Sequence, residues 1–288
     1  LAYGGIQPEM KDALADLQKL YAEGVIDPEF GVKDAVKVSE NVNAGKVGMF
    51  YGYFWNCSSG WLQDGKMNDP SIDWIAVPIL SIDDEPAKAM VPFATTYYTV
   101  VSKDCANPEA AVKMYNLVLE KMFGETAQPE VYNSTPENLA VFNYAYSYGE
   151  PPMKNLDAQQ AVVAALESGD ASGLSAEQKN YYDNCVAYEE SGDLALWGNY
   201  MMYGPDGGLG VINEYVSSGN VVTDNYFGAP TDSMAEKNAT LQKLQLETFT
   251  KIITGSADVD EFDTYVENWK SLGGQQITDE VNEWLAQR

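Results

Sequence analysis

Histidine is absent from this 288-residue sequence, and arginine occurs once, at Arg288. Histidine is the usual proton shuttle near neutral pH and the commonest protein ligand of transition metals. Its absence excludes catalytic triads built on histidine, and we expect neither a cofactor nor a catalytic metal. A single arginine leaves the interior without the forked guanidinium that binds carboxylates and phosphates through paired hydrogen bonds. The sequence therefore favours a neutral ligand.

Cysteine is scarce as well. Cys57, Cys105 and Cys185 form no C-x-x-C pair and no zinc-binding spacing, so we expect buried small hydrophobic side chains, with one disulfide as an open alternative. No stretch approaches the roughly 20 apolar residues of a membrane helix, and no signal peptide opens the chain. Because the chain begins at Leu1 and turns almost at once into a predicted helix, we expect it to start partway through a longer precursor.

Basic residues are few beside acidic ones, 17 against 43, which gives a formal charge of −26. Such a chain repels the phosphates of nucleic acids and the anionic face of a membrane, so nucleic acid is not an expected partner. This acidity is typical of a soluble, exposed surface, although it would also attract cations or polyamines. With 45% hydrophobic residues the chain can fill one large domain or two modest ones. We expect a monomer.

Hydrophobic periodicity predicts an alternation of helices and strands in the first part of the chain. A largely parallel sheet is the simplest way to connect such units, so the predicted fold class is α/β. After residue 124 the pattern becomes mainly helical. The predicted helices are 7–23, 38–44, 109–123, 175–190, 209–217, 232–253, 260–272 and 278–286, and the predicted strands are 47–55, 73–80 and 97–103.

Several short motifs follow one another along nearly the whole chain. They read IQPEM at 6–10, LYAEGVIDPEF at 20–30, GKVGM at 45–49, GP at 204–205, WKSLGG at 269–274 and EVNEW at 280–284. In this order and spacing the sequence resembles the family 1 extracellular solute-binding proteins of Gram-positive bacteria, in their lipoprotein branch. Each motif alone is weak, and the resemblance rests on their succession.

The resemblance implies a type II periplasmic-binding-protein fold, in which two lobes joined by crossover strands close on a ligand. Residues 1–75 would lie in the second lobe, 76–125 would be the return segment of the first lobe, and 126–288 would complete the second lobe with a helical C-terminal region. The N-terminal part of the first lobe, with a signal peptide and a lipidated cysteine, would precede Leu1.

The function implied by the resemblance is capture without catalysis. Such a protein is held at the cell surface through its N-terminal lipid and binds a neutral sugar or oligosaccharide between its lobes. It then delivers this ligand to the permease subunits of an ABC importer in the membrane. The expected partners are therefore a saccharide and the two permease subunits.

Aromatic residues suit such a ligand, because saccharides present apolar C–H faces together with a belt of hydroxyl groups. The first candidate site contains Tyr53, Trp55 and Asn56. A strand that ends in aromatic residues beside glycine and asparagine would place rings at the carboxyl edge of the sheet, where α/β proteins bind ligands. Packing of these rings into the core is the alternative, and we favour it for Phe50 and Phe54.

The second candidate site contains Trp197, Asn199 and Tyr203, before a glycine-rich turn that suggests a ring exposed on a loop wall. A tryptophan that anchors a helix end is the alternative interpretation. Thr96 and Tyr97, at the start of a predicted strand, could offer hydroxyl groups, although β-propensity explains them equally well.

Met234 is a further candidate, because it lies where the last cleft segment of the resembled family enters a long helix, close to Thr231. Trp269 and Trp284, in contrast, stand at helical spacing with apolar neighbours. We expect these two tryptophans to pack helices together rather than to bind ligand.

Two other classes of function share parts of this inventory. A carbohydrate-active hydrolase would add two carboxylates at a defined separation, and Glu189 with Glu190, or Asp206 near Trp197, could be nominated. Nothing in the sequence fixes either pair across a sugar, and adjacent helical residues do not face each other. A calcium-dependent interaction protein would use acidic loops such as 258–263, but that run lacks the EF-hand pattern and is more simply an acidic first helical turn.

Overall fold

The computed structural model describes residues 1–288 except 59, 94, 96, 134–139 and 146, and it divides into two compact units. The first, here the terminal unit, combines Leu1–Ala35 with Asp224–Arg288, and the second, here the central unit, is Val36–Thr223. The two ends of the chain thus build one unit together. These bounds are not the lobe boundaries that the resemblance implies, and the assignment of residues 1–75, 76–125 and 126–288 to lobes stays a prediction.

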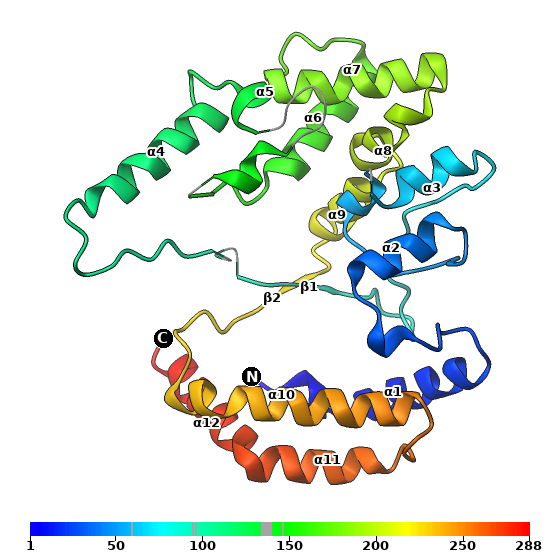
Figure 1. Ribbon diagram of the computed structural model, residues 1–288, viewed down its shortest axis with the longest axis vertical. Helices are drawn as coiled ribbons and strands as arrows, with labels where there is room; N and C mark the ends of the chain where they lie inside the picture. The colour runs from blue at the N-terminus through cyan, green and yellow to red at the C-terminus, as the bar shows by residue number, and fades with distance from the viewer. Residues whose placement is uncertain (59, 94, 96, 134–139, 146) are drawn as a thin grey trace. The chain divides into compact units, whose positions relative to one another are not determined.

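The terminal unit is helical (Figure 1). Pro8 stands in the first turn of its first long helix, and Thr231 Oγ1 accepts a hydrogen bond from the Met234 amide (3.2 Å) at the start of the longest one. The predicted helices at 7–23 and 232–253 are confirmed. Its elements are η1 (Gly4–Ile6), α1 (Pro8–Ala22), η2 (Phe30–Val32), α10 (Asp232–Ile253), α11 (Glu261–Trp269), η5 (Lys270–Gly274) and α12 (Gln275–Ala286).

The core of the terminal unit brings α1 against the C-terminal helices. Leu14, Ile252 and Tyr265 are almost fully buried in one cluster that also contains Trp269. The Tyr3 ring lies parallel to the Trp269 indole, with centroids 4.7 Å apart. Burial of apolar surface is the main stabilising term here. The prediction that Trp269 packs helices together is confirmed, whereas Trp284 is half-buried and its ring contacts Tyr226 and Phe227.

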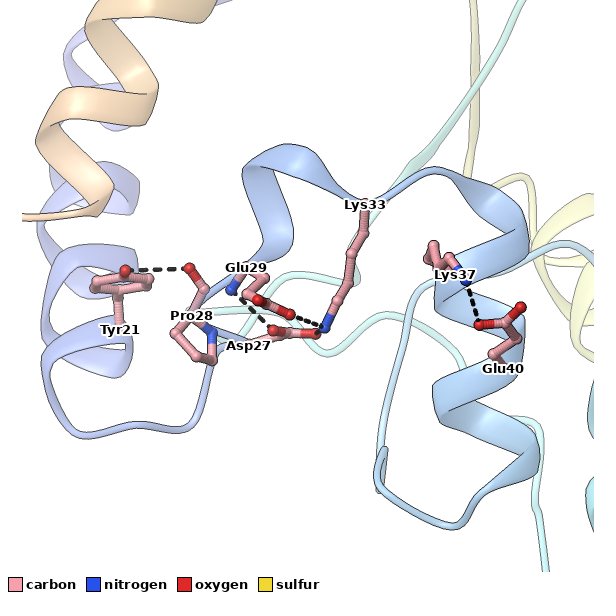
Figure 2. A network of polar contacts seen from close by, with 7 residues as sticks. All are labelled: Tyr21, Asp27, Pro28, Glu29, Lys33, Lys37 and Glu40. Carbon is pink, nitrogen blue, oxygen red and sulfur yellow. Dashed lines mark hydrogen bonds and ion pairs between the residues drawn. The ribbon is translucent and has the colours of Figure 1, made fainter.

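A polar turn leads out of α1 and contains part of the motif LYAEGVIDPEF. Asp27 Oδ1 accepts from the Glu29 amide (2.9 Å), while Asp27 Oδ2 lies 2.6 Å and Glu29 Oε2 lies 3.2 Å from Lys33 Nζ (Figure 2). The hydrogen bond that Lys33 Nζ donates to Asp27 is the main cause that raises the pKa of Lys33. Tyr21 Oη donates to the Pro28 carbonyl (3.3 Å). The turn is thus stabilised by hydrogen bonds and ion pairs that its own side chains form.

The central unit holds most of the remaining helices. Ser175 and Gln178 form the capping box that their spacing indicates, with the Ser175 amide donating to Gln178 Oε1 (2.9 Å) and the Gln178 amide to Ser175 Oγ (3.3 Å). The helical elements are α2 (Ala35–Asn43), η3 (Phe54–Cys57), α3 (Leu62–Asn68), α4 (Glu109–Phe123), α5 (Pro129–Tyr132), η4 (Val141–Tyr144), α6 (Lys154–Ser168), α7 (Ala176–Ser191), α8 (Leu194–Tyr203) and α9 (Gly208–Ser217).

Two hydrophobic clusters stabilise the central unit. The first cluster, between α6, α7, α8 and α9, contains Val162, Cys185 and Tyr203. The second joins α2, α3 and η3 to α8 and contains Val42, Leu62 and Trp197. Helix α8 therefore contributes side chains to both clusters, and its position determines how the two halves of the unit fit together.

Strand content is low. In the described part of the chain the strands are β1 (Ala89–Val91) and β2 (Val221–Thr223), which pair in parallel with Ala89 opposite Val221. The strands predicted at 47–55, 73–80 and 97–103 are wrong for this structure, because an extended segment becomes a strand only when a neighbour completes its backbone ladder. Residues 71–79 do alternate between exposed and half-buried side chains, as a strand would. The Ile79 amide donates to Tyr215 Oη (2.7 Å) instead of to a strand.

The described helices include none that is both long enough and apolar enough to cross a membrane. Of the cysteines, Cys57 and Cys185 are buried and Cys105 is exposed, and all three are free thiols. Our expectation of buried cysteines is confirmed for two of them and wrong for Cys105. Burial raises the pKa of the Cys57 thiol to about 11 and that of the Cys185 thiol to about 12.

Thiol labelling tests these positions. At pH 8 a disulfide reagent should modify Cys105 rapidly and leave Cys57 and Cys185 unmodified, because reaction requires an accessible thiolate. Mass spectrometry of the native protein should show one label per chain, and unfolding in guanidinium chloride should expose all three thiols. Rapid labelling of Cys185 in the native protein would contradict the placement of α7 against α8.

The approach of α8 to η3 depends on Gly198. A Cβ atom at this position would lie 2.5 Å from the Cys57 carbonyl oxygen, closer than real atoms pack. Gly65 in α3 is also buried, but a Cβ there would meet its nearest neighbour, Asn43 Cα, at an ordinary 3.5 Å. The two glycines thus provide a matched pair of helix positions, one without space for a methyl group and one with it.

We expect Gly198→Ala to lower the free energy of unfolding by about 1–3 kcal/mol, the usual cost of overpacking, despite the better helix propensity of alanine. Gly65→Ala should leave stability unchanged or raise it by up to about 1 kcal/mol. Urea unfolding followed by circular dichroism measures both values. Equal stability of the two variants would contradict the close packing at Gly198.

Candidate functional site

The η3 turn presents two exposed aromatic rings on a buried base. Asn56 and Cys57 are buried, and Asn56 Oδ1 accepts a hydrogen bond from the Tyr53 amide (2.7 Å), which closes the turn. Phe54 packs against the first cluster of the central unit, while Cys57 belongs to the second cluster. Alternate residues of the turn are thus fixed inside, and the neighbouring side chains, Tyr53 and Trp55, point outward.

Tyr53 and Trp55 together form what we call the aromatic platform. Their rings stack in parallel, with centroids 4.3 Å apart and an interplanar angle of 9°, and the Phe54 ring meets the indole edge-on at 5.1 Å. Tyr53 is 67% exposed and Trp55 48%. A flat exposed pair on a fixed turn is the kind of surface on which the apolar face of a sugar ring stacks.

A second feature, here the tyrosine–carboxylate network, lies where α6, α7 and α8 meet. Glu177 Oε1 accepts from Asn133 Nδ2 (2.9 Å), from Lys154 Nζ (3.0 Å) and from Tyr181 Oη (2.9 Å). Lys154 Nζ also lies 3.6 Å from Glu150 Oε2. Lys154 and Glu177 are both mostly buried, so these bonds form in a region where water competes little.

Tyrosine rings line this network. Tyr181 and Tyr203 stack with centroids 3.8 Å apart, and Tyr203 Oη donates to Asn155 Oδ1 (3.3 Å). Burial is the main cause that raises the pKa of both phenols above the ordinary value, so both stay protonated in neutral solution. Burial, followed by the hydrogen bond with Glu150, likewise raises the pKa of Tyr148. The network therefore contains uncharged phenol groups hydrogen-bonded beside carboxylates.

The structure connects some of the predicted residues. Tyr203 belongs to the network, and the exposed Tyr97 meets the Tyr148 ring edge-on with centroids 6.4 Å apart. Phe54 of the platform turn packs on the cluster that contains Tyr203. Thr96 lies outside the described residues. Platform and network are thus attached to one core in the central unit.

Trp197 and Asn199 do not lie on a loop wall. Both are inside α8, and Trp197 is only 2% exposed, within the cluster that joins α8 to α2 and α3. The alternative interpretation, a tryptophan that anchors a helix, describes its position, and its substitution would test core packing rather than stacking. Asn199 Oδ1 accepts a weak hydrogen bond from the Cys185 thiol (3.8 Å) and is half-buried.

Met234 is in the terminal unit, where its side chain packs against the core. Sequence reasoning did not single out Tyr148, Lys154, Glu177 or Tyr181. The spacing of Glu177 and Tyr181, four positions apart in one predicted helix, places them on one face and was the available signal. Lys154 comes from another helix, and no local pattern connects it to them.

The chain resembles two known proteins over most of its length. It is 26% identical over 277 residues to an uncharacterized protein in the butB 5′ region of Niallia circulans, which covers 94% of this chain and 97% of that protein. It is 25% identical over 284 residues to lipoprotein LipO of Bacillus subtilis, which covers 95% of this chain and 50% of LipO. The chain thus spans about half the length of LipO. No protein-family model and no solved structure matches it.

The network also makes a prediction about stability. Lys154→Met should lower the free energy of unfolding by about 2–3 kcal/mol, because it leaves two partly buried carboxylates without their ammonium partner. The control is Lys179→Met in α7, whose ion pair with Asp183 is about half exposed, at 48% and 55%, and should be worth less than about 0.5 kcal/mol. Urea unfolding at neutral pH distinguishes the two variants, and a similar loss in both would contradict the role of Lys154.

Proposed function

We propose that this chain is the ligand-binding part of an extracellular substrate-binding lipoprotein that captures a neutral sugar or oligosaccharide for an ABC importer. The observation that carries the proposal is the aromatic platform, two parallel rings that stay exposed on a turn whose other residues are buried. Such rings suit a ligand with flat apolar faces. The tyrosine–carboxylate network connects helices of the core on which the platform turn packs.

The ligand is proposed to be neutral for reasons of charge. The chain has one arginine and a formal charge of −26, so an anionic ligand would meet repulsion and would find no guanidinium fork within the central unit. The similarity to a protein named lipoprotein supports a lipid anchor at the outer surface of the cell. Permease subunits in the membrane are the partners that such an anchored protein would serve.

The proposed fold is the type II periplasmic-binding-protein fold. Parallel pairing of β1 with β2, far apart in sequence, is consistent with a crossover between the proposed lobes. The alternating exposure of residues 71–79, with Ile75, Val77 and Ile79 all exposed, is the pattern of a strand within a sheet.

Turnover of the sugar is not part of the proposal. A hydrolase would need two carboxylates free to act on a glycosidic bond. Glu177 Oε1, near Glu150 in the network, is instead engaged by three donors that connect helices. A chromatographic assay for released reducing sugar, run on the same oligosaccharides as the binding assay, tests this point. Release that disappears in Glu150→Gln would favour the hydrolase.

Substitution on the platform tests the binding role. Trp55→Ala should weaken saccharide binding by about 1–3 kcal/mol, or roughly 5- to 150-fold in Kd, because it removes a stacking face. Isothermal titration calorimetry against a panel of mono- and oligosaccharides, on the full-length protein, gives the value. The control is Tyr51→Ala, which removes a nearby ring that is even more exposed, at 82%, and lies outside the stacked pair, and it should change Kd less than about twofold. Unchanged affinity in Trp55→Ala would remove the platform from the binding site.

A further inference from the structure

A second aromatic site lies in the terminal unit, between the turn at 224–229 and the end of α12. Asp224 Oδ1 accepts from the Tyr226 amide (2.9 Å), and Tyr226 Oη donates to the Ala229 carbonyl (2.6 Å), so the turn is closed by its own bonds. A Cβ atom at Gly228 would lie 2.9 Å from Trp284 Nε1. The backbone of this turn therefore lies directly against the indole, and its position is fixed.

The turn brings two rings to Trp284. Phe227 stands almost perpendicular to the indole, at 87° with centroids 5.0 Å apart, and Tyr226 meets it at 66° and the same distance. Phe227 is 48% exposed, and Trp284 is half-buried. Two perpendicular rings enclose a corner with an aromatic face on each side.

A cation occupies this corner. The guanidinium carbon of Arg288 lies 4.2 Å from the Trp284 centroid and 4.9 Å from the Phe227 centroid, over both faces. Aromatic faces attract cations within about 6 Å of the ring centroid, and tryptophan attracts them most. Two such faces at right angles are the arrangement by which proteins recognise alkylammonium groups.

Helical spacing explains why Arg288 contacts Trp284, but it does not explain the contact with Phe227. Arg288 follows Trp284 by four positions at the end of α12, so an arginine there reaches the indole by local geometry alone. Phe227 belongs to a different segment, and its position depends on the closed turn and on Gly228. The formal charge of −26 also raises the concentration of cations near the protein.

We propose that the corner between Trp284 and Phe227 is a binding site for a compact organic cation, a trimethylammonium or similar alkylammonium group, and that Arg288 occupies it in competition. This site is independent of the proposed saccharide site. It belongs to the terminal unit, and it uses the attraction between a positive charge and aromatic faces instead of stacking with hydroxyl recognition.

Choline is a suitable probe, because its neutral isostere 3,3-dimethylbutan-1-ol has the same shape without the charge. We expect Arg288→Gln, which vacates the corner, to bind choline saturably and at least about tenfold more tightly than the isostere. The wild type should bind choline at least about threefold more weakly than Arg288→Gln, because its own guanidinium competes. Calorimetry and the ring-current shift of the choline methyl protons measure both effects on the full chain.

Substitutions of the two aromatic residues that form the corner, Trp284 and Phe227, are the controls. In the Arg288→Gln background, Trp284→Leu and, separately, Phe227→Leu should each weaken choline binding by about tenfold, whereas Trp284→Phe should retain part of it. Phe227 is exposed, so its variant remains informative even if Trp284→Leu fails to fold. Absence of saturable binding by Arg288→Gln, or equal binding of choline and its isostere, would overturn the proposal. Saccharide binding in the same variants should be unchanged. Failure of the cation site can therefore be distinguished from failure of the proposed saccharide function.

Discussion

The close contact between the η3 backbone and helix α8 is the constraint on which the central unit depends. The Cys57 carbonyl fills the space that a side chain at position 198 would need, and a glycine stands there. The amide oxygen of Asn56 is buried and would be costly without a donor, and the Tyr53 amide supplies one. The turn therefore has one favourable shape, which holds the Tyr53 and Trp55 rings outward before any ligand arrives. A site arranged in advance loses less entropy on binding.

Helices were predictable from the sequence because their signals are local. Pro8 in a first turn, the Ser175–Gln178 capping box and the Thr231 cap act within three residues of their targets, and the predicted helices there form. The strands were not predictable, because a strand exists only through hydrogen bonds to a distant segment. Residues 73–80 have the composition and the alternation of a strand, yet none of the described segments pairs with them. Local pattern determines that this segment is extended, and only tertiary partners decide whether it becomes a strand.

In the candidate site, too, local sequence did not determine where single residues lie. Glycine beside tryptophan at 197–198 suggested a loop, but this glycine is needed inside a helix, where two backbones approach closely. The Trp197 indole is buried by the same contact between η3 and α8 that requires Gly198. At Trp55 the sequence correctly indicated an aromatic segment, while the exposure of its ring comes from a helical turn instead of a strand end. The network assembles Asn133, Lys154, Glu177 and Tyr203 from four segments, and no sequence spacing links them.

The two aromatic sites, at Trp55 and at Trp284, differ in the angle of the neighbouring ring, and this angle determines what each can bind. Tyr53 lies parallel to Trp55, so the pair offers broad flat faces, which suit a flat, uncharged ligand with polarised C–H bonds. Phe227 stands perpendicular to Trp284, so two electron-rich faces converge on a small volume, which suits a compact positive charge. The only guanidinium of the chain lies in that second corner. Because the aromatic residues are of the same kinds at both sites, composition alone could not separate them, and the difference arises from the turns that orient the rings.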